Sequence, residues 1–157
     1  MSFFKKYYDS VSRRVHALDK DKIDLIYKLI KNTSKNKGTI YLAGNGGSAS
    51  TASHISTDLT KNAKVKATTF NDVNLITCFS NDYGYENWLK AAVKYYVKSN
   101  DLVILLSVSG ESKNLINAAN LCKKRKIKLI TITGANKKNS LSKKGIINYW
   151  INSKAYN

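Results

Sequence analysis

The chain has little of several residue types that mark particular classes of protein. Its 157 residues include no proline, two cysteines and two histidines. Cys78 and Cys122 lie far apart in apolar surroundings and form no metal-ligand motif, so we expect buried free thiols in a reducing compartment. The longest apolar run, from Leu102 to Leu106, predicts a strand and is far too short to span a membrane. The amphipathic N-terminus also lacks the apolar block of a signal peptide. We therefore expect a cytoplasmic protein with no membrane partner.

Acidic residues are also scarce, with 10 Asp and Glu against 27 Lys and Arg and a formal net charge of +17. Such an excess suits nucleic acid, an anionic membrane or an acidic substrate. The excess is almost entirely lysine and is spread along the whole chain. Arginine, the residue that reads base edges with paired hydrogen bonds, occurs at Arg13, Arg14 and Arg125 alone. Nucleic-acid binding is therefore the least favoured of the functions considered.

Apolar periodicity predicts two N-terminal helices, over residues 3–18 and 23–30, followed by alternating strands and helices. The expected strands are 39–43, 65–69, 102–108, 127–133 and 147–151, and the expected helices are 48–61, 85–98, 112–125 and 138–143. This order predicts an α/β fold with a five-stranded parallel sheet and helices on both faces. No repeat or linker divides the chain, so we expect one domain over 1–157. Its helical pair (1–36) can pack on another subunit or on its own sheet, and its α/β core is 38–157.

A glycine-rich loop follows the first expected strand, within the segment GTIYLAGNGGSASTASHISTD at residues 38–58. Glycines allow close approach of an anion, and the following helix would present unpaired N–H groups and a positive dipole end. His54 and Asp58 are four residues apart, so they share a helix face beyond the loop. They are a candidate acid/base or metal pair, or else a hydrogen-bonded contact on the helix surface.

Two further loops lie at the carboxyl ends of expected strands or before a helix, where α/β proteins bind ligands. Residues 107–112 read SVSGES and could hold one phosphate through serine hydroxyls and helix N–H groups. Alternatively, Ser112 is simply a helix N-cap and Ser109-Gly110 a turn. The other loop is 81–85. Neither a Walker motif nor a dinucleotide fingerprint is present, because Ala49 stands where the latter needs its third glycine.

Together these segments resemble the SIS (sugar isomerase) domain of the phosphoheptose isomerase family. The resemblance lies in GNGGSASTASHISTDL, NDYGYENW, SVSGESKN and KLITITG and extends from about Lys22 to the fifth strand. It implies a three-layer SIS sandwich and a homotetramer with sites between subunits. It also implies isomerisation of sedoheptulose 7-phosphate to D-glycero-D-manno-heptose 7-phosphate, in the supply of heptose for lipopolysaccharide or other surface sugars.

The resemblance also implies roles for individual residues. Asp58 would be the catalytic base, and His54 and Asp58 would be zinc ligands. Asp82 would bind a substrate hydroxyl or orient a catalytic group. The remaining substrate-binding residues would be Asn45, Gly46, Gly47 and Ser48 at the sugar, and Ser107, Val108, Ser109 and Ser112 at the phosphate.

Three departures from the family pattern are visible. Asp58 stands in place of the family's longer glutamate, and Val108 in place of a threonine. The chain ends at Asn157, before the long C-terminal helix that carries a glutamine and a histidine in family members, so we expect a truncated form with an incomplete zinc site. A second hypothesis follows, in which the chain is a non-catalytic SIS protein that binds a sugar phosphate or a protein partner, as a scaffold associated with a replication initiator does.

Overall fold

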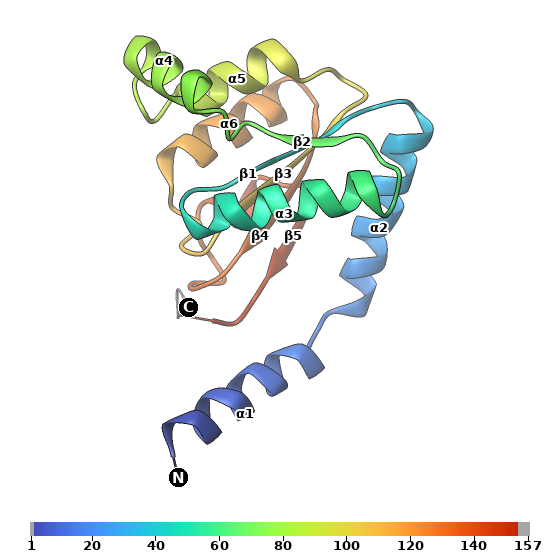
Figure 1. Cartoon of the computed structure of the whole chain (residues 1–157), viewed down its shortest axis with the longest axis vertical. Coiled ribbons are helices and arrows are strands. Elements are labelled where there is room, and N and C mark those ends of the chain that lie inside the picture. The colour runs from blue at the N-terminus through green and yellow to red at the C-terminus, as the bar shows by residue number, and fades with distance from the viewer. Residues whose placement is uncertain (1, 154–157) are drawn as a thin grey trace.

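The computed structural model describes residues 2–153, and its centre is a five-stranded parallel sheet (Figure 1). Every neighbouring pair of strands is parallel, and the spatial order is β2-β1-β3-β4-β5. The strands are β1 (Ile40–Ala43), β2 (Ala67–Thr69), β3 (Leu102–Ser107), β4 (Lys128–Thr133) and β5 (Ile147–Trp150). No helix within residues 2–153 is long and apolar enough to cross a membrane.

Helices cover both faces of the sheet, as the sequence predicts (Figure 1). They are α1 (Phe3–His16), α2 (Lys20–Lys35), α3 (Gly47–Lys61), α4 (Val73–Tyr83), α5 (Trp88–Tyr96), α6 (Lys113–Lys124) and the short 3-10 helix η1 (Leu141–Lys143). On one face, apolar side chains of α5 and α6, such as Leu89 and Leu115, pack on Leu105 of β3. On the other, α2 and α3 cover Leu42 and Ile104. The three-layer α/β fold is thus confirmed.

Helix α4 was not expected, because the sequence reading placed a loop at 81–85 and one helix over 85–98. The side chain of Asp72 caps α4 by accepting a hydrogen bond from the Leu75 N–H at 2.8 Å, and Ile76 and Phe79 pack against the core. Gly84, at φ +79°, then ends α4, and α5 begins at Trp88. The N-cap and the apolar spacing were present in the sequence, and both indicate a separate helix.

The two cysteines differ in exposure, which corrects the expectation that both are buried. Cys122 lies on the inward face of α6 and is fully buried, whereas Cys78 lies on the outer face of α4 and is exposed. Burial raises the pKa of the Cys122 thiol to about 12. The helical pattern of α4, once recognised, would have separated these two environments.

The two N-terminal helices are placed differently. Helix α2 packs on its own sheet through Ile26, Leu29 and Ile30. Helix α1 projects from the rest of the molecule (Figure 1), and none of its residues is buried. A hydrogen bond joins α1 to the segment after β5, from Arg14 Nε to the Asn152 carbonyl at 2.8 Å.

Candidate functional site

The loops after β1 and β3 meet at the point where the order of the strands along the sheet reverses. Strand β1 lies between β2 and β3, and the chain passes from β1 through α3 to β2 on one side, while β3 begins the run toward β5 on the other. Ligands of open α/β sheets bind at the carboxyl ends of the strands at such a switch point. The fold therefore brings together the glycine-rich loop and the serine-rich loop that the sequence singled out.

A cavity of about 360 Å³ lies between these loops. Its volume is within the range of small-molecule sites. Its lining residues are Asn45, Gly47, Ser48, Thr51, Leu106, Ser107, Val108, Ser109 and Ser112. A second cavity, of about 280 Å³, shares five of these residues and continues past Ile132 and Gly134 to Ile151. Together the two cavities form a polar pocket with an apolar extension toward β5.

Hydrogen bonds within the serine loop fix its shape beside the cavity. The buried Ser107 Oγ accepts a hydrogen bond from the Gly110 N–H at 3.0 Å and lies 3.5 Å from Ser112 Oγ. Ser109 Oγ accepts from the Glu111 N–H at 3.2 Å. Ser112 is the N-cap residue of α6, yet its side chain makes no capping hydrogen bond. The first N–H groups of α6 therefore receive no hydrogen bond from this side chain and remain available to an anion.

The glycine loop presents a second helix N-terminus to the same cavity. Gly46 is the N-cap of α3 at φ +53°, and the N–H groups of Ser48 and Ala49 donate to the Asn45 and Gly46 carbonyls. At Gly44 a Cβ would come within 2.7 Å of Ser48, so the tight turn requires glycine there. None of the nine lining residues carries a charge. An anion in this cavity would therefore be held by N–H groups, hydroxyls and the two helix dipoles.

Asn45 is fixed by a partner that the sequence reading missed. Its Nδ2 donates to Asn114 Oδ1 at 3.0 Å, and Asn114 Nδ2 donates back to Asn45 Oδ1 at 2.9 Å. The Tyr85 hydroxyl also donates to Asn45 Oδ1, at 3.4 Å. These contacts occupy both lone pairs of the oxygen and one of the two amide hydrogens. A ligand can thus meet the Asn45 side chain through one remaining N–H.

Asn114 is 2% exposed and lies in the first turn of α6, two residues after Ser112. Its signal in the sequence is weak, since a polar residue in a first helical turn usually faces solvent. Tyr85 ends the loop 81–85 that the sequence singled out, although no role in the site was expected of this residue. The position of Asn114 follows from the packing of α6 beside the glycine loop, and that of Tyr85 from the turn between α4 and α5.

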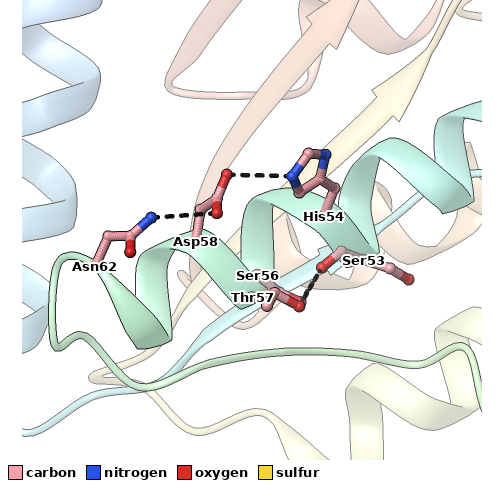
Figure 2. A network of polar contacts seen from close by, with 6 residues as sticks. All are labelled: Ser53, His54, Ser56, Thr57, Asp58 and Asn62. Carbon is pink, nitrogen blue, oxygen red and sulfur yellow. Dashed lines mark hydrogen bonds and ion pairs between the residues drawn. The ribbon is translucent and has the colours of Figure 1, made fainter.

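His54 and Asp58 lie together on the outer side of α3, as Figure 2 shows. His54 Nε2 is 3.5 Å from Asp58 Oδ2, and Asn62 Nδ2 donates to Asp58 Oδ1 at 3.3 Å. The side chains of His54 and Asp58 are 80% and 56% exposed. Neither residue lines the two cavities. Their positions on α3 are one and two turns beyond Thr51, which does line them.

The pair falls short of a complete zinc site. Catalytic zinc is held by three protein ligands, and no group of three His, Cys, Asp or Glu side chains that could hold a metal occurs within residues 2–153. His54 and Asp58 would supply two donors. These residues alone do not fit a catalytic zinc ion.

Asp82 is not brought to the cavity. It lies on the exposed last turn of α4, where its Oδ1 accepts from Asn81 Nδ2 at 3.0 Å and its Oδ2 is 3.9 Å from Cys78 Sγ. Because α4 continues to Tyr83, Asp82 belongs to this helix and not to a loop at the sheet edge. The resemblance implied substrate-binding residues in the glycine loop, in the serine loop and at Asp82. The structure brings the two loops together at one cavity, and Asp82 lies outside its lining.

Comparison with known proteins places this arrangement in a family. The SIS domain model matches residues 4–134. The chain is 36% identical over 124 residues to the phosphoheptose isomerase of Haemophilus ducreyi, an alignment that covers 74% of this chain and 64% of that protein. It is 32% identical over 137 residues to the phosphoheptose isomerase of Helicobacter pylori, covering 83% and 71% respectively. The structure of a phosphoheptose isomerase from Francisella tularensis matches with a TM-score of 0.86 at 23% identity, covering 99% of this chain and 89% of that one.

The chain therefore belongs to the SIS domain family, whose fold it shares. Within that family it belongs to the phosphoheptose isomerase branch, as the identity to the Helicobacter pylori protein shows. It spans just under two thirds of the length of the Haemophilus ducreyi relative.

Proposed function

We propose that this protein isomerises sedoheptulose 7-phosphate to D-glycero-D-manno-heptose 7-phosphate in the cytoplasm, for the synthesis of bacterial surface polysaccharides. The observation that carries the proposal is the cavity formed jointly by the serine loop and the glycine loop in a member of the phosphoheptose isomerase branch. The phosphate group would bind at the serine loop, and the sugar would extend toward the glycine loop.

The serine loop supplies the phosphate contacts in this proposal. Ser107, Ser109 and Ser112 contribute hydroxyls, and the uncapped N-terminus of α6 contributes N–H groups and a positive dipole end. Val108 has no hydroxyl to offer, so its contribution would be through the backbone. The phosphate lies at the end of the carbon chain remote from the reacting carbons. Its binding energy would therefore serve to orient the sugar.

The chemistry requires one base. A carboxylate removes a proton from C1 of the ketose and returns it to C2, while the hydroxyl proton moves from O1 to O2, so that the carbonyl shifts to C1. We assign the base to Asp58, with His54, 3.5 Å away, as the group that orients its carboxylate. The enediolate oxygen needs a stabilising group as well. His54 and Asp58 offer two of the three protein ligands that a catalytic zinc ion needs, so we assign this stabilisation to no metal.

In this proposal the protein associates with further copies of the same chain. Exposed aromatic side chains gather on α1, at Phe3, Phe4, Tyr7 and Tyr8. These side chains border an apolar hollow, and none of residues 3–16 packs into the core. An isolated helix of this length is marginal in water, so an amphipathic helix without a core contact needs another surface. We propose that α1 helices of several copies pack together in a homotetramer.

A second candidate function is binding of a sugar phosphate, or of a protein partner, without turnover. The observation that favours it is the separation of Asp58 and His54 from the cavity lining, while the phosphate loop is complete. Asp58 is also one methylene shorter than the glutamate of the family. A misplacement of about 1 Å can cost on the order of a hundredfold in rate.

The test is to incubate the protein with sedoheptulose 7-phosphate, with and without zinc, and to follow heptose 7-phosphate by NMR. Turnover that disappears in Asp58→Ala and rises in Asp58→Glu would support the isomerase. Phosphate resonances that shift on binding, without product in either metal condition, would favour the binding protein. Asp24→Ala on α2 is a suitable control, since it also removes an exposed carboxylate.

A further inference from the structure

A carboxylate stands inside the loop that we assign to the phosphate. Glu111 lies between Ser109 and Ser112, and its negative charge would repel a phosphate bound there. Its side chain is turned to another segment: Glu111 Oε1 accepts a hydrogen bond from the Ser140 N–H at 2.8 Å. The hydrogen bond from Ser140 and the charge of Lys143 hold the pKa of Glu111 below its usual value. The residue is thus ionised and engaged at neutral pH.

The Ser140 contact is one of three that join the serine loop to the segment after β4. The Leu141 N–H donates to the Gly110 carbonyl at 2.9 Å, and the Gly134 N–H donates to the Val108 carbonyl at 3.1 Å. Glu111 provides the one side chain among these contacts. Ser140 and Leu141 do not line the phosphate cavity. Their hydrogen bonds therefore support the serine loop from outside the cavity.

Gly110 of the serine loop packs closely against Asn139, so its position depends on the position of the segment 139–142. Gly110 has φ +69°, and a Cβ there would come within 2.1 Å of the Asn139 side chain. Asn139 is 1% exposed and is fixed in turn, because its Oδ1 accepts from the Ser142 N–H at 2.8 Å. A shift of the segment 139–142 would move Gly110, and with it the Ser107 hydroxyl that accepts from the Gly110 N–H.

We propose that Glu111 is a positioning residue that holds the serine loop in its anion-binding shape by accepting the Ser140 N–H. The proposal rests on the assignment of the phosphate to this loop. It predicts that Glu111 favours phosphate binding although its charge opposes it. The hydrogen-bond acceptor favours binding, whereas the negative charge opposes it.

The experiment compares Glu111→Gln, which keeps an acceptor oxygen and loses the charge, with Glu111→Ala, which loses both. Binding of inorganic phosphate and of sedoheptulose 7-phosphate is measured by calorimetry. We expect Glu111→Ala to bind both about three- to tenfold more weakly, the size of one hydrogen bond. Glu111→Gln should bind within about twofold of the wild type or more tightly, because the repulsion is gone. Asp24→Ala, which removes a charge from α2, should leave binding unchanged.

Ser140→Pro removes the donor in place of the acceptor, and the Ser140 φ of −63° suits proline. It should weaken binding as much as Glu111→Ala does, and the double variant should bind no more weakly than either single one. If Ser140→Pro fails to fold, the two Glu111 variants still decide the question. Any result in which Glu111→Gln and Glu111→Ala behave alike, including tighter binding in both, overturns the proposal.

The same measurements distinguish a failure of the proposed isomerase reaction from a failure of the proposed role of Glu111. Phosphate binding with the expected order of the variants, but no conversion of sedoheptulose 7-phosphate, would refute the reaction and leave the role of Glu111 intact. A wild-type protein that binds neither phosphate compound would refute both. Turnover together with indistinguishable Glu111 variants would refute the positioning role alone.

Discussion

The reciprocal amide pair of Asn45 and Asn114 offers a sharp test of how the site is assembled. Asn114→Ala removes two hydrogen bonds, of 2.9 and 3.0 Å, from a residue that is 2% exposed. Each such bond contributes about 0.5–1.5 kcal/mol net, so we expect a loss of roughly 1–3 kcal/mol in the free energy of unfolding. In a chain of this size that corresponds to a fall in Tm of roughly 2–12 °C.

A double-mutant cycle isolates the pair. Asn45→Ala removes the same two bonds, so the double variant should lose less than the sum of the single losses. We expect a coupling energy of about 1 kcal/mol, measured by urea denaturation of the four proteins. The control is Asn36→Ala at the end of α2, where Nδ2 donates to the Asn32 carbonyl at 2.9 Å. Its loss should add to that of Asn45→Ala.

Additive losses for Asn45 and Asn114, within about 0.5 kcal/mol, would refute the paired arrangement. The same variants also bear on the ligand. Without Asn114, the Asn45 amide is free to turn and has more hydrogen-bonding groups to offer, but it has lost its fixed orientation. We therefore expect weaker binding of the sugar phosphate in Asn114→Ala, with binding of inorganic phosphate at the serine loop less affected.

Four further predictions concern other parts of the chain. Gly110→Ala should lower Tm and weaken phosphate binding in calorimetry, because the new Cβ would come within 2.1 Å of Asn139 at φ +69°; unchanged values would contradict the loop geometry. A thiol reagent near pH 8 should label Cys78 and spare Cys122, whose pKa is raised by burial to about 12. Because the unfolded thiol ionises near pH 9, burial of Cys122 should make stability fall as pH rises from about 9 to 12, and Cys122→Ala should flatten that slope in denaturation titrations. Replacing Phe4 and Tyr8 of α1 by serine should shift the protein to a smaller species in sedimentation velocity without lowering the helix content of the core; an unchanged sedimentation coefficient would argue against packing through α1.

The loops of the site could be predicted from the sequence because their information is local. Gly44 and Gly46 stand where a strand turns sharply into a helix, and the serines repeat around Gly110, which needs a positive φ. Such residues mark a turn wherever they occur. That the two loops face each other also followed, since parallel strands end at one edge of a sheet. The order of strands and the cavity agree with this reasoning.

Contacts between distant segments could not be predicted in the same way. Asn114 looks like any polar residue in a first helical turn, and its burial comes from the approach of α6 to the glycine loop. Glu111 looks like a solvated charge until Ser140, 29 residues later, is placed beside it. Helix α4 is a different case, because its cap at Asp72 was readable.

The position of α3 shows how far residue spacing can be used to infer a site. Four-residue spacing places His54 beside Asp58 whatever the helix packs on, and the structure has them 3.5 Å apart. Spacing does not say what that face meets. Thr51 lines the cavity, whereas Asp58 lies seven residues on, about 10 Å along the helix axis. For Asp58 to act as the base, the substrate must reach from the serine loop along the outer side of α3. The phosphate and C1 are at opposite ends of the heptose chain, so the carbon chain would have to lie nearly extended beside this helix.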